Sequence, residues 1–153
     1  MRTLLLTLCF LLPVSPSLAT CWYQAGARYG IEPELLQAIA IVESGLDPNA
    51  INKNNDGTVD YGLMQINSRH LGVLKKYQIS QQDLIQDPCQ CVMAGAWILA
   101  GNIQRMGYTW EAVGAYNAGA AKTPQRQALR QKYIQKVVPH YLRLKSRQKN
   151  KHS

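Results

Sequence analysis

The sequence has few of the residues that build metal and cofactor sites. It contains three histidines and four cysteines, and it has neither a phosphate-binding loop nor a dinucleotide fingerprint. The closely spaced pair Cys89 and Cys91 has no histidines at structural zinc spacing. Segment 52–57 begins like a calcium loop, but Leu63 occupies the position that needs a bidentate Glu. We therefore expect no metal and no cofactor.

The sequence also lacks an apolar run of about twenty residues, the length that a membrane-spanning helix needs. Its longest apolar run, residues 4–12, follows a positive Arg2 and precedes small residues that end at Ala19. This order is typical of a secretory signal peptide. We expect residues 1–19 to be removed and the mature chain to be exported to the periplasm. A lipidation box ending at Cys21 is the poorer alternative, because a threonine precedes that cysteine.

Acidic residues are absent from the last part of the chain. From Lys122 onward there are ten Lys and Arg and no Asp or Glu, whereas residues 20–121 carry six basic and nine acidic residues. We expect one domain over residues 20–145 and a basic C-terminal tail over 146–153. A solvated helix face running into a disordered end is the simplest interpretation, and an anionic polymer, a membrane or a partner protein are alternatives. Nucleic acid is not expected, because no nucleic-acid-binding motif accompanies the charge.

Three cysteines remain after signal removal, which is an odd number for an oxidising compartment. Cys89 and Cys91 are too close in sequence to pair with each other without strain. We expect Cys21 to pair with one of them and favour Cys89.

Apolar spacing and capping residues predict a mostly helical domain. A segment rich in Asn, Asp and Gly over 47–57 reads as a long loop, and the extended run 58–66 suggests a small hairpin. The predicted helices cover 22–29, 33–44, 70–77, 81–85, 88–106, 110–117 and about 125–144.

Glu43 lies on the apolar side of the predicted helix 33–44, because it follows Ile39 by four residues. Its place in the last turn puts the carboxylate at the negative end of the helix dipole, and apolar neighbours desolvate its charge. Both effects raise the pKa of a carboxyl group toward the range where it donates a proton near neutral pH. The alternative is an inward Glu that pairs with Arg28 or Arg105.

Asp60 lies on the predicted hairpin, seventeen residues after Glu43. A helix end that faces a hairpin places two carboxylates on opposite sides of a groove. Cleavage of a glycosidic bond needs such a pair, because one acid protonates the leaving oxygen while negative charge stabilises the sugar cation. The alternative for Asp60 is a strand-end Asp bonded to backbone amides.

Three ordered motifs resemble those of the lytic transglycosylases related to the soluble lytic transglycosylase. They are Glu43-Ser44, the GLMQI segment 62–66 and the AYNAG segment 115–119. The resemblance spans nearly all of the expected mature chain. Within this family, the chain is most similar to the small, secretion-associated IagB/IpgF-like group. Segment 56–69 also resembles the hairpin of animal C-type lysozymes, whose second carboxylate falls on Asp60. The resemblance implies a mainly α, lysozyme-like α+β domain with one small β-hairpin beside the active-site groove.

The resemblance implies a lytic transglycosylase that cleaves the β-1,4 bond between N-acetylmuramic acid and N-acetylglucosamine of peptidoglycan. Glu43 would act first as acid and then as base, giving a 1,6-anhydromuramoyl product without water. Ser44 would orient Glu43 or the N-acetyl group, and core packing is the alternative for Met64. The substrate-binding residues implied in this way are Ser44, Met64, Gln65, Tyr116 and Asn117.

Two other functions stay open from the sequence. A lysozyme-type muramidase would use Glu43 and Asp60 for hydrolysis, and a noncatalytic assembly factor would bind peptidoglycan without turnover. The expected partners are peptidoglycan glycan strands and a periplasmic component of a type III or type IV secretion apparatus. We expect a monomer, with the wall opened locally for a secretion, pilus or conjugation system.

Overall fold

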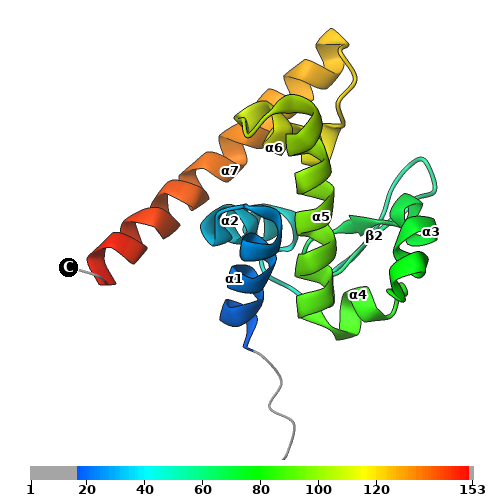
Figure 1. Cartoon of the computed structure of the whole chain (residues 1–153). Helices are drawn as coiled ribbons and strands as arrows, with labels where there is room; N and C mark the ends of the chain where they lie inside the picture. Colours follow the sequence, from blue (N-terminus) through cyan, green and yellow to red (C-terminus); the bar gives the residue numbers. More distant parts are fainter. Residues whose placement is uncertain (1–16, 152–153) are drawn as a thin grey trace, which may run out of the picture.

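The computed structural model describes residues 17–151, and helices dominate it (Figure 1). The α-helices are α1 (Leu18–Tyr29), α2 (Pro33–Ser44), α3 (Leu71–Leu74), α4 (Asp83–Gln86), α5 (Pro88–Met106), α6 (Trp110–Ala118) and α7 (Pro124–Lys151). Two 3₁₀ segments, η1 (Ser68–His70) and η2 (Lys75–Tyr77), flank α3. The strands are β1 (Ile51–Lys53), β2 (Val59–Tyr61) and β3 (Ile66–Asn67). The predicted mainly helical class with a small β region is confirmed.

Capping residues set the ends of the first two helices. The Ser17 hydroxyl caps α1, which begins four residues earlier than predicted, and Gly30 ends it in the left-handed conformation. Helix α2 has the predicted bounds, because Pro33 suits its first turn and the left-handed Gly45 stops it. Residues 1–16 of the expected signal peptide lie outside the described residues.

Helix α5 forms the centre of the core. It packs on α1, α6 and α4, with α2 and β3 also in contact. Asp87 caps it through two backbone amides, and Gly107 follows its last residue, as the sequence predicts. Val92, Ala96 and Leu99 form an apolar stripe at three- and four-residue steps along this helix, and all three are fully buried. The stripe therefore identifies the side of α5 on which the domain is built.

The β region is larger than predicted. A three-stranded antiparallel sheet in the order β1-β2-β3 replaces the single hairpin, and β1 lies inside the segment expected to be a loop. All three residues of β1 are exposed, so this edge strand lacks the apolar alternation that marks a strand in sequence. The register pairs Asp60 with Asn52 on one side and Asn67 on the other.

Helix α7 is longer than predicted and continues through the described part of the expected tail to Lys151. It packs against α6 and α2, and its last turns project beyond the other elements (Figure 1). Glu32, just before α2, holds the distal part of the helix, because it accepts hydrogen bonds from Tyr141 at 2.5 Å and Lys145 at 2.8 Å. The start of α2 is thus tied to the second half of α7.

A disulfide joins Cys21 to Cys89 and ties α1 to the start of α5, which confirms the favoured pairing. Cys91 is free and buried. Over residues 17–151 no helix combines the length and the apolar character that crossing a membrane requires.

Candidate active site

Glu43 lies in the last turn of α2, with its side chain turned toward α7. Its Oε1 accepts a hydrogen bond from the Tyr133 hydroxyl at 2.6 Å. The salt bridges among residues 17–151 are Arg130 with Glu111 and Lys145 with Glu32. The alternative in which Glu43 pairs with an arginine is therefore wrong.

Burial raises the pKa of Glu43 to about 7, from an ordinary value of 4.5. Desolvation is the largest cause, and the negative charge of Asp60 adds to it. The hydrogen bond from Tyr133 and the charge of Lys136 act in the opposite direction, because both favour the ionised form. Near neutral pH this carboxyl group can therefore both donate and accept a proton.

Asp60 is held in the middle strand of the sheet as a fixed negative charge. Its Oδ2 accepts from the Asn54 amide at 2.9 Å, and its Oδ1 accepts from the Asn67 amide at 2.8 Å. Both partners are side-chain amides, one from the turn before β2 and one from strand β3. The alternative stated from the sequence was a bond to backbone amides. Since its charge acts on Glu43, the two carboxylates share one electrostatic environment.

Ser44 connects α2 to the turn between β2 and β3. Its hydroxyl donates to the Leu63 carbonyl at 2.7 Å and also lies 3.2 Å from the Ala40 carbonyl. This contact fixes the helix end that carries Glu43 against the sheet. Ser44 can therefore orient Glu43 only indirectly, by fixing the backbone of the last turn of α2.

Two residues implied as sugar contacts have structural positions. The Met64 side chain is fully buried beside Gly95, so core packing describes it and a place in the groove does not. Gln65 is buried with a positive φ of 50°, and its amide donates to the carbonyls of Gly62 and Ala50 and accepts from Asn52. The amide of Gln65 is committed to holding the turn, which corrects its expected contact with sugar.

The third motif supplies one fixed and one free side chain. The Tyr116 hydroxyl donates to the Met64 carbonyl at 2.8 Å, which joins α6 to the turn. Desolvation and the charge of Glu43 raise the pKa of Tyr116 well above its usual value, so it stays a donor. Asn117 is exposed, and its side chain has no hydrogen-bond partner among residues 17–151. Asn117 is therefore available to a ligand.

The largest cavity beside this site has a volume of about 730 Å³ and includes Tyr116 and Gly119 in its wall. Its wall continues to His70 and Trp97, whose rings meet edge to face with centroids 6.0 Å apart. Trp97 thus presents part of its ring to open space. The cavity ends short of Glu43, which is absent from its wall.

Sequence reasoning missed the contribution of α7 to this site. Tyr133 contacts Glu43 directly, and Lys136 acts on it one turn later. A signal was present, because Arg130, Tyr133 and Val137 are buried residues at three- and four-residue steps in a polar segment. A tyrosine on such a buried face needs a hydrogen-bond partner.

The side chains that gather here can perform acid–base chemistry without a bound ion. Within the described part of the chain, no group of three His, Cys, Asp or Glu side chains is placed to hold a metal. The arrangement offers one carboxyl group poised near neutrality, one fixed negative charge and two tyrosine hydroxyls.

Comparison with known proteins agrees with this geometry. The family described as Transglycosylase SLT domain matches residues 20–138. The invasion protein IagB of Salmonella typhimurium is 48% identical over 145 residues, covering 93% of this chain and 89% of the relative. Protein IpgF of Shigella flexneri is 42% identical over 154 residues, covering 98% and 97%.

A solved structure gives the same fold. The chain resembles an inactive mutant of the lytic transglycosylase Slt from Pseudomonas aeruginosa, with a TM-score of 0.62 and 22% identity. The match covers 80% of this chain and 23% of that protein, so the chain spans about a quarter of its length. By its family match and by the identity of these relatives, the chain belongs to the transglycosylase SLT domain family and is a peptidoglycan lytic transglycosylase.

Proposed function

We propose that Glu43 is the acid and base with which this enzyme cleaves the bond between N-acetylmuramic acid and N-acetylglucosamine, leaving a 1,6-anhydromuramoyl end. The observation that carries the proposal is the pKa of Glu43, raised to about 7 by burial and by the charge of Asp60. A single carboxyl group that changes protonation state near neutral pH can serve both halves of the reaction.

The proposed reaction has two steps. The protonated Glu43 gives its proton to the glycosidic oxygen, and the bond from that oxygen to the muramoyl C1 breaks. Positive charge develops at C1, where the fixed charge of Asp60 stabilises it. Glu43, now a carboxylate, takes the proton of the C6 hydroxyl as O6 bonds to C1, which restores the acid without water.

Asp60 also supports a second candidate, a muramidase in which water attacks C1. The hydrogen-bond partners of Asp60 favour the lytic transglycosylase reaction over the muramidase. Each oxygen of Asp60 accepts a side-chain amide, so the carboxylate is a fixed charge more than a group free to activate water. Asn117 and the cavity from Tyr116 to Trp97 are proposed to bind sugar, since the cavity wall combines aromatic rings with polar side chains such as Asn102 and Gln104.

Peptidoglycan as substrate places the enzyme in the periplasm or at the cell wall. We further propose that it opens the wall for a secretion, pilus or conjugation apparatus, with support from its likeness to proteins named for invasion. This role predicts that Glu43→Gln abolishes export by that apparatus in a cell that otherwise makes the protein normally. Normal export with the variant would contradict it.

The catalytic role of Glu43 is tested by release of soluble sugars from purified peptidoglycan. Glu43→Gln keeps the size of the side chain and removes its proton chemistry, so we expect turnover to fall below detection. Glu32→Gln is the matched control, because Glu32 also accepts a hydrogen bond from a tyrosine of α7 but lies at the other end of α2. Equal losses in both variants would show that folding, and not chemistry, was measured.

A further inference from the structure

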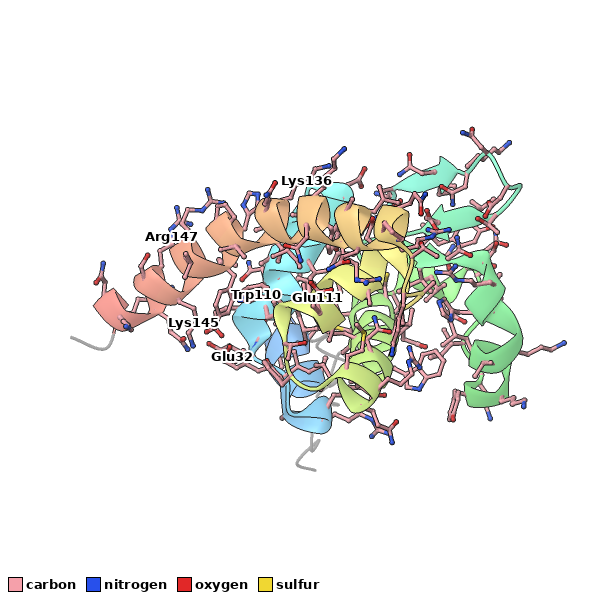
Figure 2. The ribbon with its side chains drawn as sticks, turned by 90° about the horizontal axis from the view of Figure 1, so that it is seen from above. Glu32, Trp110, Glu111, Lys136, Lys145 and Arg147 are labelled. Atoms are coloured by element: carbon pink, nitrogen blue, oxygen red, sulfur yellow. A yellow bond between two sulfur atoms is a disulfide. The ribbon has the colours of Figure 1, made fainter. Side chains whose placement is uncertain are left out.

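Basic side chains form a continuous line along one side of α7, which we call the basic ridge. Successive members are three or four residues apart, so they share one face of the helix. The ridge consists of Lys132, Lys136, His140, Arg143, Arg147 and Lys151. It spans twenty residues, and the nineteen helical steps from Lys132 to Lys151 cover about 28 Å. Figure 2 shows Lys136 and Arg147 on the same edge of α7, with Lys145 on the opposite edge.

No acidic side chain among residues 17–151 forms a salt bridge with the ridge. Helix α7 contains no acidic residue, and the five Lys and Arg of the ridge are all exposed. The two salt bridges among residues 17–151 use Arg130 and Lys145, neither of which belongs to the ridge. Arg143 contacts the Nδ1 of His140 at 2.7 Å, which brings no negative charge. A row of unpaired cations is a surface that fits an anionic ligand.

One end of the ridge lies at the catalytic carboxylate. Lys136 follows Tyr133 by three residues, and its charge acts on Glu43. The other end extends along the part of α7 that projects from the domain (Figure 1). The family match ends at residue 138, so most of the ridge lies beyond the region that the family shares. The ridge thus begins near Glu43 and continues past the region that the family model matches.

The chemistry of the substrate indicates what the ridge contacts. The sugars of a peptidoglycan strand are uncharged apart from the peptides they carry, and those stem peptides end in carboxylates. A strand bound at Glu43 therefore brings its negative charges past Lys136. The large apolar side chains exposed on α7 are Leu129 and Leu142, which lie thirteen residues apart, so they form no continuous apolar face for insertion at a membrane interface.

We infer that the basic ridge binds the stem-peptide carboxylates of peptidoglycan, so that the enzyme recognises peptide-bearing strands. This inference rests on peptidoglycan being the substrate, but not on which product is formed. It predicts that binding weakens as salt is added, because contacts between exposed charges are screened.

Binding is measured by co-sedimentation with insoluble sacculi, using the mature chain with Glu43→Gln so that turnover plays no part. One batch of sacculi is left intact, and in a second the free carboxyl groups are converted to amides. The ridge variant is Arg143→Gln with Arg147→Gln, both distant in sequence from the residues placed at the active site. Lys75→Gln with Lys76→Gln removes the same charge from the exposed segment η2 and is the control.

We expect the parent and the control to bind intact sacculi more tightly than amidated sacculi, and the ridge variant to lose about five- to thirty-fold on intact sacculi only. An equal loss in the control, or unchanged binding by the ridge variant, would overturn the inference. So would a ridge variant that keeps its sacculus binding but loses binding to vesicles containing an anionic phospholipid. Because no bond is cleaved, a failure here is distinct from a failure of the proposed chemistry.

Discussion

At the scale of single residues, the site depends on opposing influences on Glu43. Desolvation and Asp60 raise its pKa, while Tyr133 and Lys136 lower it. The result, about 7, makes the acid form the majority below neutral pH and the base form the majority above it. Since the first step needs the proton, we expect kcat/KM to be nearly constant at acid pH and to fall as the pH rises through about 7.

The hydrogen bond from Tyr133 is tested by Tyr133→Phe. Loss of a bond to a charged group is expected to lower turnover about ten- to hundred-fold. Because the donor favours the ionised carboxylate, its removal raises the pKa of Glu43 and moves the falling limb of the pH profile to higher pH. Tyr141→Phe is the control, since Tyr141 makes a similar bond to Glu32. A profile that does not move would show that Tyr133 has only a packing role.

Replacement of Asp60 by Asn should move the falling limb of the pH profile to lower pH. Removal of its negative charge lowers the pKa of Glu43, so activity is lost at lower pH than in the parent. Turnover should fall roughly a hundred-fold through lost stabilisation of the sugar cation. Asp56→Asn is the control, because Asp56 is exposed and bonds Thr58 in the same loop. Pre-steady-state and steady-state rates across pH measure both effects, and parent-like behaviour would remove Asp60 from the mechanism.

Some of these residues could be predicted from sequence and others could not. Periodicity and capping placed Glu43 in the last turn of a helix, and the direction of its pKa followed from that place. The hydrogen bonds from Ser44 to the Leu63 carbonyl and from Gln65 to the Ala50 carbonyl join segments that are 19 and 15 residues apart, so no local pattern reveals them. The motif that contains Met64 does mark a segment of the site. Met64 itself supplies a backbone carbonyl that accepts from Tyr116, and its side chain is buried in the core.

At the scale of elements, the helices were predictable because each has its own stop signal. Gly30, Gly45 and Gly107 end the helices that the sequence bounded. Strand β1 could not be predicted, because all three of its residues are exposed and show no apolar alternation. It is defined by its pairing with β2, which a local pattern cannot reveal. The sequence predicts an end of α7 near residue 144 and a tail from residue 146, whereas Lys145 binds Glu32 and the helix continues to Lys151.

The turn between β2 and β3 is tested by Gly62→Ala. Gly62 has a φ of 73°, and a Cβ there would overlap the carbonyl oxygen of Leu84 and lie 3.0 Å from Cys91 Sγ. Gly57 has a φ of 83° with open space around it, so Gly57→Ala adds only backbone strain of about 1 kcal/mol. We expect Gly62→Ala to lower the free energy of unfolding in urea by clearly more than Gly57→Ala. Equal losses would mean that packing against α4 is loose.

At the scale of the whole molecule, the disulfide between Cys21 and Cys89 closes a segment of 68 residues that contains both carboxylates. Substitution of both cysteines by serine should lower the free energy of unfolding by about 4 kcal/mol, because the unfolded chain regains its freedom. Urea titrations of the two proteins, with and without reductant, measure this. A parent whose stability does not respond to reductant would contradict a structural role for the bond.

Helix α7 takes part both in the proposed catalysis by Glu43 and in the proposed binding of stem peptides. Helix α7 carries Tyr133, which bonds the proposed acid and base Glu43, and the basic ridge beyond it, and its distal part is held by Glu32. Catalysis and recognition of the charged peptides would therefore share one rigid element. The sequence shows that α7 is basic, but only the fold shows that the charge of Lys136 acts on Glu43.

The most direct test of the central claim is the mass of the sugars that the mature chain releases from purified peptidoglycan. Intramolecular attack by the C6 hydroxyl predicts products that end in 1,6-anhydromuramic acid, one water lighter than hydrolysed fragments and absent with Glu43→Gln. Products with reducing ends, formed by the parent and lost in both Glu43→Gln and Asp60→Asn, would contradict the account and establish a muramidase.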